Sequence, residues 1–162
     1  MPLVPFESLP SSARVWVFAG DHAVAAPAAV QLLSEVDAYL SQWKAHGAPL
    51  TCGRDWADDR FLTIAVDQSA AGASGCSIDG LFRTLSAIGP AIGASMIGTA
   101  LVHYRDRSGA IQSVSREAFG ERAGHGEITT ETPVYDTSVT TLDEWRERFA
   151  STVGESWHAA LL

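Results

Sequence analysis

The sequence of 162 residues contains a single lysine, Lys44, and only two cysteines, Cys52 and Cys76. Its arginines are scattered along the chain, and the net charge is -8. Nucleic acids are bound by cations gathered on one face, so we expect no nucleic-acid partner. The two cysteines lie too far apart for a CxxC motif, which argues against a zinc ribbon or a thioredoxin-type site.

Long apolar runs are also lacking. The longest weakly polar stretch, residues 88–102, is interrupted by glycines and Pro90 and is too short to cross a membrane. The N-terminus has neither the basic start nor the apolar block of a signal peptide. We therefore expect a cytoplasmic protein with no membrane partner, in which both thiols stay reduced.

Nucleotide-binding motifs are absent as well. A P-loop needs GxxxxGK followed by serine or threonine, whereas Lys44 is followed by Ala45. The glycines at positions 89, 93 and 98 do not fit GxGxxG, and neither HExxH nor GxSxG occurs. The sequence therefore predicts no P-loop ATPase, no metal site and no cofactor.

What the sequence does contain is typical of a folded domain, with 46% hydrophobic residues. Residues 1–13 carry three prolines and three serines and are expected to form a loose arm, and residues 14–162 a single domain. Strand and helix patterns follow one another in the order β-α-β-β-α-β. The corresponding segments are 14–20, 27–45, 49–56, 60–68, 77–88 and 96–105. This order predicts an α+β fold with a ferredoxin-like (split β-α-β) antiparallel sheet, helices on one face and a C-terminal helical extension.

Local signals set the expected helix ends. Pro27 suits a first helical turn, and Gly47 suits the left-handed residue that ends a helix. Gly89 and Pro90 are expected to stop the second helix. Thr141 and Glu144 have the spacing of a capping box, so the last helix should begin at residue 142.

The stretch AAGASGCSIDGLFRTL, residues 70–85, brings a cysteine to the start of the second predicted helix. In a ferredoxin-like sheet, that helix start lies at the same end as the end of the first helix and the ends of the third and fourth strands. The residues expected to converge there are His46, Asp67, Cys76, Asp79, Tyr104 and Arg105. A C-terminal tail folded over this end would add His158.

Such a group suits nucleophilic cysteine chemistry. A helix N-terminus and a nearby histidine both favour the thiolate form of Cys76, and Asp67 or Asp79 would orient the base, His46. The backbone around Ser74, Gly75 and Ser77 would bind an anion or oxyanion. The hypothesis is therefore a small-molecule pocket, catalytic or ligand-binding, in a thiol-dependent hydrolase or transferase.

Each of these residues also has a structural interpretation. A cysteine near a helix start is commonly a packing residue, and Ser77 suits a helix N-cap. Asp79 carries the negative charge that a helix dipole favours in the first turn, and it would raise the pKa of the Cys76 thiol. His46 suits a helix C-terminus, and Asp67 suits a turn. The alternative function is accordingly a non-catalytic protein-protein interaction module, including a homodimer, for which the acidic surface and the five tryptophans are suited.

Several segments together resemble a known family. These are WKAHGAPL, VDQSAAGASGCSID, SVSREAF, TTETPVYDTSVTTLDE and SWH, in this order between Val15 and His158. The chain resembles a family of small uncharacterised bacterial proteins whose members are often labelled ABC transporter ATPase. The run from Ser74 to Asp79 is the most specific part of this resemblance, which implies no catalytic residues of its own.

Overall fold

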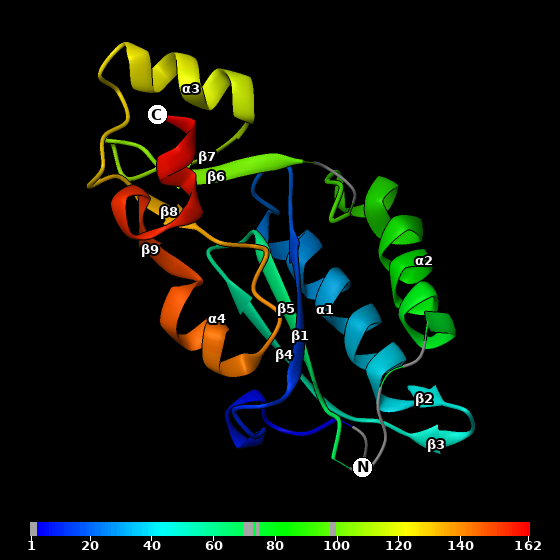
Figure 1. Cartoon of the computed structure of the whole chain (residues 1–162). Helices are drawn as coiled ribbons and strands as arrows, with labels where there is room; N and C mark the ends of the chain where they lie inside the picture. Colours follow the sequence, from blue (N-terminus) through cyan, green and yellow to red (C-terminus); the bar gives the residue numbers. More distant parts are fainter. Residues whose placement is uncertain (1–2, 70–72, 74, 98–99) are drawn as a thin grey trace.

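The computed structural model describes residues 3–69, 73, 75–97 and 100–162. The chain forms two antiparallel sheets, with two long helices covering one face of the first sheet (Figure 1). This arrangement confirms the α+β class. Within the described part of the chain, no helix combines the length and the apolar composition that a membrane crossing requires.

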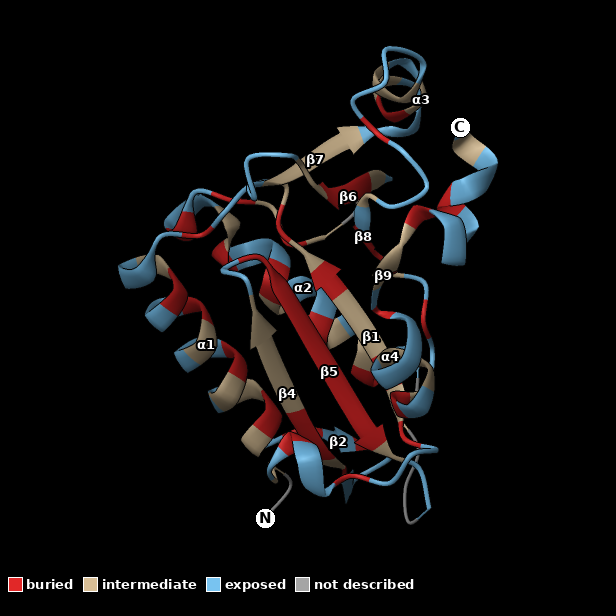
Figure 2. Cartoon of the chain, turned by 90° about the vertical axis from the view of Figure 1, so that its left-hand side faces the viewer, coloured by how far each residue is buried: buried red, intermediate tan, exposed pale blue. Residues whose placement is uncertain are grey.

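The first sheet is built around β5 (Phe61–Asp67). It pairs on one side with β1 (Arg14–Ala19) and on the other with β4 (Thr51–Ala57), both antiparallel. All six residues from Phe61 to Val66 are buried, and Figure 2 shows β5 as the most continuously buried strand. Because the chain covers both faces of β5, its sequence is a nearly continuous apolar run, interrupted only by Thr63, and does not alternate.

The two long helices, α1 (Ala26–Ser41) and α2 (Gly75–Ile92), cover one face of this sheet. Their buried residues recur every three or four positions, as one face of a helix requires. On α1 these residues include Leu32, Val36 and Leu40, and on α2 they include Leu81 and Leu85. They pack against β5 in the largest apolar cluster, where each buried leucine stabilises the fold by about 2 kcal/mol.

The second sheet has the order β7-β6-β8-β9 and comes from the C-terminal half of the chain. Its strands are β6 (Leu101–Arg105), β7 (Ile111–Ser115), β8 (Pro133–Tyr135) and β9 (Ala150–Thr152). The helix α3 (Arg116–Gly124) follows β7, and the helix α4 (Leu142–Arg148) lies between β8 and β9 in the chain. Two 3-10 turns, Val153–Glu155 and Trp157–Leu161, end the chain.

An aromatic cluster joins the two sheets. The ring centroid of Phe61 on β5 lies 4.6 Å from that of Tyr135, 5.3 Å from Phe149 and 5.4 Å from His103. The pairs with Phe149 and His103 are edge-to-face, and such pairs add to the free energy gained by burying the rings. The second sheet therefore covers the end of β5 that α1 and α2 leave open.

The ferredoxin-like arrangement predicted for the fourth strand is not found in the described residues. Such a fold places the strand after α2 beside β1, whereas β6 pairs with β7 and β8 in the second sheet. The edge of β1 is partly taken by a later segment, since the Val15 N–H donates to the Thr140 carbonyl oxygen over 2.9 Å.

Both predicted helix ends move. The first helix ends at Ser41, four residues early, because residues 44–49 form a small hairpin. The second helix continues through Gly89 and Pro90, although Pro90 has no N–H to donate to the Ser86 carbonyl oxygen. It ends at Ile92, before Gly93, whose φ is +69°.

The start of α4 matches its prediction closely. Thr141 is the N-cap, and its Oγ1 accepts the Glu144 N–H. The Glu144 carboxylate accepts the N–H of Thr140, one residue earlier than a standard capping box requires.

The N-terminal arm is packed, which corrects the expectation of a loose one. The N–H of Val4 donates to the Cys52 carbonyl oxygen over 2.8 Å, and Phe6 and Leu9 are buried. Gly53 allows this close approach, because a Cβ there would lie 2.8 Å from the carbonyl oxygen of Val4. The arm therefore covers part of the face of the first sheet opposite α1 and α2.

Buried His103 predicts a specific loss of stability in acid. Burial, with smaller contributions from Arg60 and His158, lowers the pKa of His103 from 6.5 to about 4. The unfolded chain then binds a proton at higher pH than the folded chain, so the free energy of unfolding falls between pH 6.5 and 4. The loss is on the order of 3 kcal/mol and levels off below pH 4. Urea unfolding at successive pH values measures it.

The variant His103→Gln should show a shallower pH dependence in this window, while His125→Gln, at an exposed position, should match the wild type. Part of the slope remains in His103→Gln, because burial also lowers the pKa of His158. Equal slopes for wild type and His103→Gln would contradict the prediction.

Candidate functional site

A surface cavity of about 760 Å³ lies where the end of α1, the following hairpin and the start of α2 meet. The side chains that matter for its chemistry come from two segments that are some thirty residues apart in the chain. They are Tyr39, Trp43, Lys44 and His46 from the first segment, and Cys76, Ser77 and Arg83 from the second.

The hairpin consists of β2 (Lys44–Ala45) and β3 (Ala48–Pro49). Its two turn residues, His46 and Gly47, have φ values of +52° and +80°, the sign that a two-residue hairpin turn of type I′ requires. Gly47 adopts this conformation without a steric penalty, whereas His46 does so at some cost. The turn presents the exposed imidazole of His46 at the wall of the cavity.

Two hydrogen bonds fix the start of α2 against the end of α1. The Tyr39 hydroxyl and the Trp43 indole N–H both donate to the Ser77 carbonyl oxygen, over 3.1 and 2.9 Å. Trp43 is only 3% exposed, and burial raises the pKa of Tyr39. Two donors on one largely buried acceptor hold the first turn of α2, and with it Cys76, in a defined position.

Gly80 allows the helices to come this close. A Cβ at this position would collide with the Tyr39 hydroxyl and would lie 3.7 Å from the Arg83 guanidinium. The side chains of Tyr39 and Arg83 therefore meet over Gly80 at the edge of the cavity.

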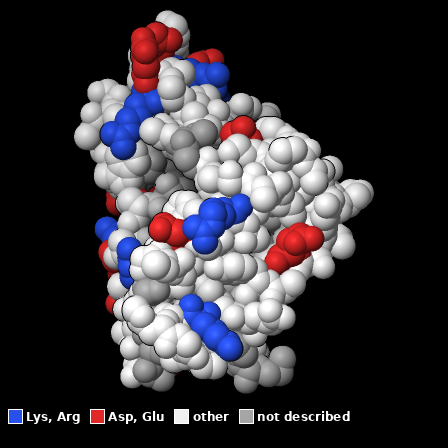
Figure 3. Space-filling view, turned by 90° about the vertical axis from the view of Figure 1, so that its right-hand side faces the viewer, with Lys and Arg blue, Asp and Glu red and all other residues white. Residues whose placement is uncertain are grey.

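The cavity is cationic, although the chain as a whole is acidic. Lys44, the only lysine in the sequence, lines it together with Arg83, and the described part of the wall contains no carboxylate. The α2 side of the molecule carries only a few charged groups, of both signs (Figure 3). An anion inside the cavity would meet Lys44 and Arg83 at a wall whose described residues include no carboxylate.

The two cysteines differ sharply. Cys76 is exposed at the cavity, whereas Cys52 is fully buried with its Sγ 3.7 Å from the Leu40 carbonyl oxygen. Burial raises the pKa of Cys52 to about 12. Cys52 is a core residue, and Cys76 is the thiol that solvent reaches.

Three of the predicted site residues, His46, Cys76 and Ser77, line the same cavity. Gly75 is the first residue of α2 and lies just outside the wall. Ser74 falls outside the described residues.

The two predicted orienting carboxylates do not line the cavity. Asp67 ends β5 and accepts the Ser69 N–H over 2.9 Å, a hydrogen bond that holds the pKa of Asp67 below its usual range. Asp79 is exposed on α2. The cavity therefore combines a thiol and a histidine without the expected third member.

Tyr104 and Arg105 do not lie beside Cys76. Both belong to β6, which joined the second sheet at the other end of the molecule (Figure 1). The Tyr104 hydroxyl accepts from Arg122, and Arg105 donates to the Tyr135 hydroxyl. Their predicted placement depended on the ferredoxin-like strand order, and it is wrong for the same reason.

His158 is also away from the cavity. It is 1% exposed in the last 3-10 turn, stacked on Trp157 with ring centroids 3.9 Å apart. Its Nδ1 lies 2.6 Å from the Ser156 hydroxyl, and burial lowers its pKa. The C-terminal tail packs on α3 and the second sheet and does not fold over Cys76.

Among the wall residues that were not predicted, four bear on the chemistry of the site: Tyr39, Trp43, Lys44 and Arg83. Two sequence signals pointed to them. The only lysine stands two residues before His46, and Arg83 follows Cys76 by seven residues, which is two helical turns on the same face.

Within the described residues, no group of three or more histidine, cysteine, aspartate or glutamate side chains is arranged to hold a metal ion. Comparison of the chain with family models, curated proteins and solved structures found no match in any of the three.

The close approach at Gly80 gives a test of the site's construction. Glycine to alanine inside a helix normally stabilises by about 1 kcal/mol, yet Gly80→Ala should destabilise the protein by about 1–3 kcal/mol because it displaces Tyr39. Combined with Tyr39→Phe, the cost should be less than additive, since both changes remove the same hydroxyl contact. Thermal or urea unfolding measures each effect.

Gly75→Ala is the matched control on the same helix, where an added Cβ meets nothing within 4 Å. It should be neutral or stabilising. A stabilising effect of Gly80→Ala would show that α1 and α2 are not packed as described.

Proposed function

We propose that the cavity beside Cys76 binds a small anionic molecule and that the Cys76 thiol takes part in its chemistry. The observation that carries this proposal is the combination of one exposed thiol with Lys44, His46 and Arg83 in a wall that has no described carboxylate. Carboxylate and phosphate groups are the usual partners of the two cations, Lys44 and Arg83.

The reaction class that these groups favour is acyl transfer or hydrolysis through a thioester. His46 would accept the thiol proton, and the Cys76 sulfur would attack the acyl carbon and expel the leaving group. Water would then release the acid and restore the thiol. This chemistry needs reduced cysteine, which agrees with the proposed cytoplasmic location.

The proposed activity does not involve a P-loop. The ABC transporter ATPase label of the family that the sequence resembles is therefore no part of it, and membership of that family is itself a proposal.

Charge selectivity of Cys76 alkylation tests the proposal. Iodoacetate and iodoacetamide attack a thiol by the same reaction, but only iodoacetate is an anion. The iodoacetate-to-iodoacetamide rate ratio at Cys76 should be higher in the folded protein than in urea, because Lys44 and Arg83 attract the anionic reagent. Lys44→Gln and Arg83→Gln should each lower the ratio roughly threefold at low salt. Mass spectrometry of the Cys76 peptide gives the rates, and in the folded protein the buried Cys52 should stay unmodified.

Arg107→Gln is the matched control, since it removes the same charge from the β6–β7 turn, away from the cavity. A ratio equal to that of the unfolded chain, or one insensitive to both cavity variants, would exclude the anion site. The alternative function, a non-catalytic interaction module, predicts that outcome. If the module is a homodimer, light scattering should also give the mass of a dimer.

A further inference from the structure

A second cavity, of about 360 Å³, lies in the C-terminal half of the molecule. Its wall is built from the start of α3, the segment after β8, the end of α4, β9 and the C-terminal turns. The wall includes Arg116, Asp136, Arg148, Ser151, Glu155 and Trp157. We propose that this cavity binds a free amino acid, recognised by its α-carboxylate and α-ammonium groups together.

The wall carries opposite charges that do not pair with one another. Arg116 and Arg148 supply two guanidinium groups, and Asp136 and Glu155 supply two carboxylates. All four residues are described, and none of the ion pairs in the structure joins one of these arginines to one of these carboxylates. Opposite charges in a cavity this small ordinarily pair unless their neighbours hold them apart.

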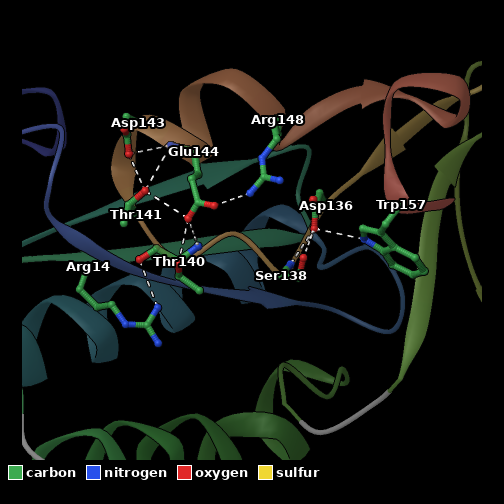
Figure 4. Close-up of polar contacts among 9 residues, drawn as sticks. All are labelled: Arg14, Asp136, Ser138, Thr140, Thr141, Asp143, Glu144, Arg148 and Trp157. Atoms are coloured by element: carbon green, nitrogen blue, oxygen red, sulfur yellow. Dashed lines mark hydrogen bonds and ion pairs between the residues drawn. The ribbon is translucent and has the colours of Figure 1, made fainter.

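Neighbouring groups do hold them. The Asp136 Oδ1 accepts the Ser138 N–H over 2.9 Å and the Trp157 indole N–H over 3.3 Å. Arg148 pairs instead with Glu144, one turn earlier on α4. In Figure 4 the dashed lines run from Asp136 to Ser138 and Trp157 and from Arg148 to Glu144, and none connects Arg148 with Asp136.

Arg116 is held by the same tryptophan. Its guanidinium carbon lies 4.9 Å from the ring centroid of Trp157, a cation-π distance, and the other partner of that ring is the stacked imidazole of His158. Trp157 thus fixes a cation by its ring and a carboxylate by its N–H.

Hydrogen-bonding capacity is left over at the wall. Asp136 is 4% exposed, and its three hydrogen bonds all end on Oδ1, so that Oδ2 retains its capacity as an acceptor. The Ser151 hydroxyl oxygen is buried and has no partner. Buried polar groups in folded proteins are normally satisfied, so the unpartnered Ser151 hydroxyl of this wall residue points to a polar ligand.

Together these groups define the ligand. Two guanidinium groups suit one carboxylate, while Asp136 Oδ2 and the Ser151 hydroxyl suit an ammonium group. A simple anion would leave the buried Asp136 carboxylate close to another negative charge, which favours a zwitterion. The volume lies near the lower end of the roughly 300–1,000 Å³ of ligand cavities, so a single amino acid fits better than a peptide.

The Trp157 indole N–H is a natural reporter, because it hydrogen-bonds to Asp136. In ¹H–¹⁵N NMR spectra, where Trp157→Phe assigns its signal, at least one of the twenty L-amino acids should shift this resonance saturably below about 10 mM. Its N-acetyl and amide derivatives, each lacking one of the two charges, should bind at least tenfold more weakly.

Arg116→Gln should also weaken binding at least tenfold, whereas Arg146→Gln, an exposed charge on α4 outside the cavity wall, should leave it unchanged. Asp136→Asn gives a second test in which the weakening should be greater for the amino acid than for its N-acetyl derivative. The proposal is overturned if no amino acid shifts the Trp157 signal, if the N-acetyl derivative binds equally well, or if Arg116→Gln binds like the wild type.

Discussion

The complete burial of β5 is the constraint on which the rest of this structure depends. A strand from Phe61 to Val66 with no face open to water requires an apolar cover on both sides. The helices α1 and α2 supply one cover. The N-terminal arm, α4 and the aromatic cluster around Phe61 supply the other. The two cavities follow from this division, since one opens in the helical layer and the other in the layer built by the C-terminal half.

Within the helical layer, the Ser77 carbonyl oxygen connects structure with proposed function. It accepts hydrogen bonds from two side chains of the first helical segment, Tyr39 and Trp43, and so sets where the start of α2 lies. Cys76 immediately precedes Ser77 in the chain, so its thiol lies at the cavity that Lys44 and His46 also line. In the other layer, Trp157 connects structure with the second proposed site. Its indole N–H donates to the Asp136 carboxylate, and its ring lies against the Arg116 guanidinium.

Much of the local structure could be predicted from the sequence, because apolar spacing and caps act over a few residues. The strands β4 and β5, the helix α1 and the Thr141 cap are examples. Partner choice between distant strands has no local signal, so β6 was assigned to the wrong sheet, and Tyr104 and Arg105 with it. Pro90 misled because the helix continues through it and buries Ile92, which offsets the hydrogen bond that proline cannot make. His46 was expected near Cys76 as a residue at a helix end, whereas a hairpin turn brings it there.

The central claim is that Lys44 and Arg83 make the space beside Cys76 a site for anions. A crystal structure of the protein carboxymethylated at Cys76 tests it most directly, because the modification attaches a carboxylate to the sulfur. The account predicts that this carboxylate turns into the cavity and lies within hydrogen-bonding distance of the Lys44 ammonium or the Arg83 guanidinium. A carboxylate that points into solvent and contacts neither Lys44 nor Arg83 would contradict it.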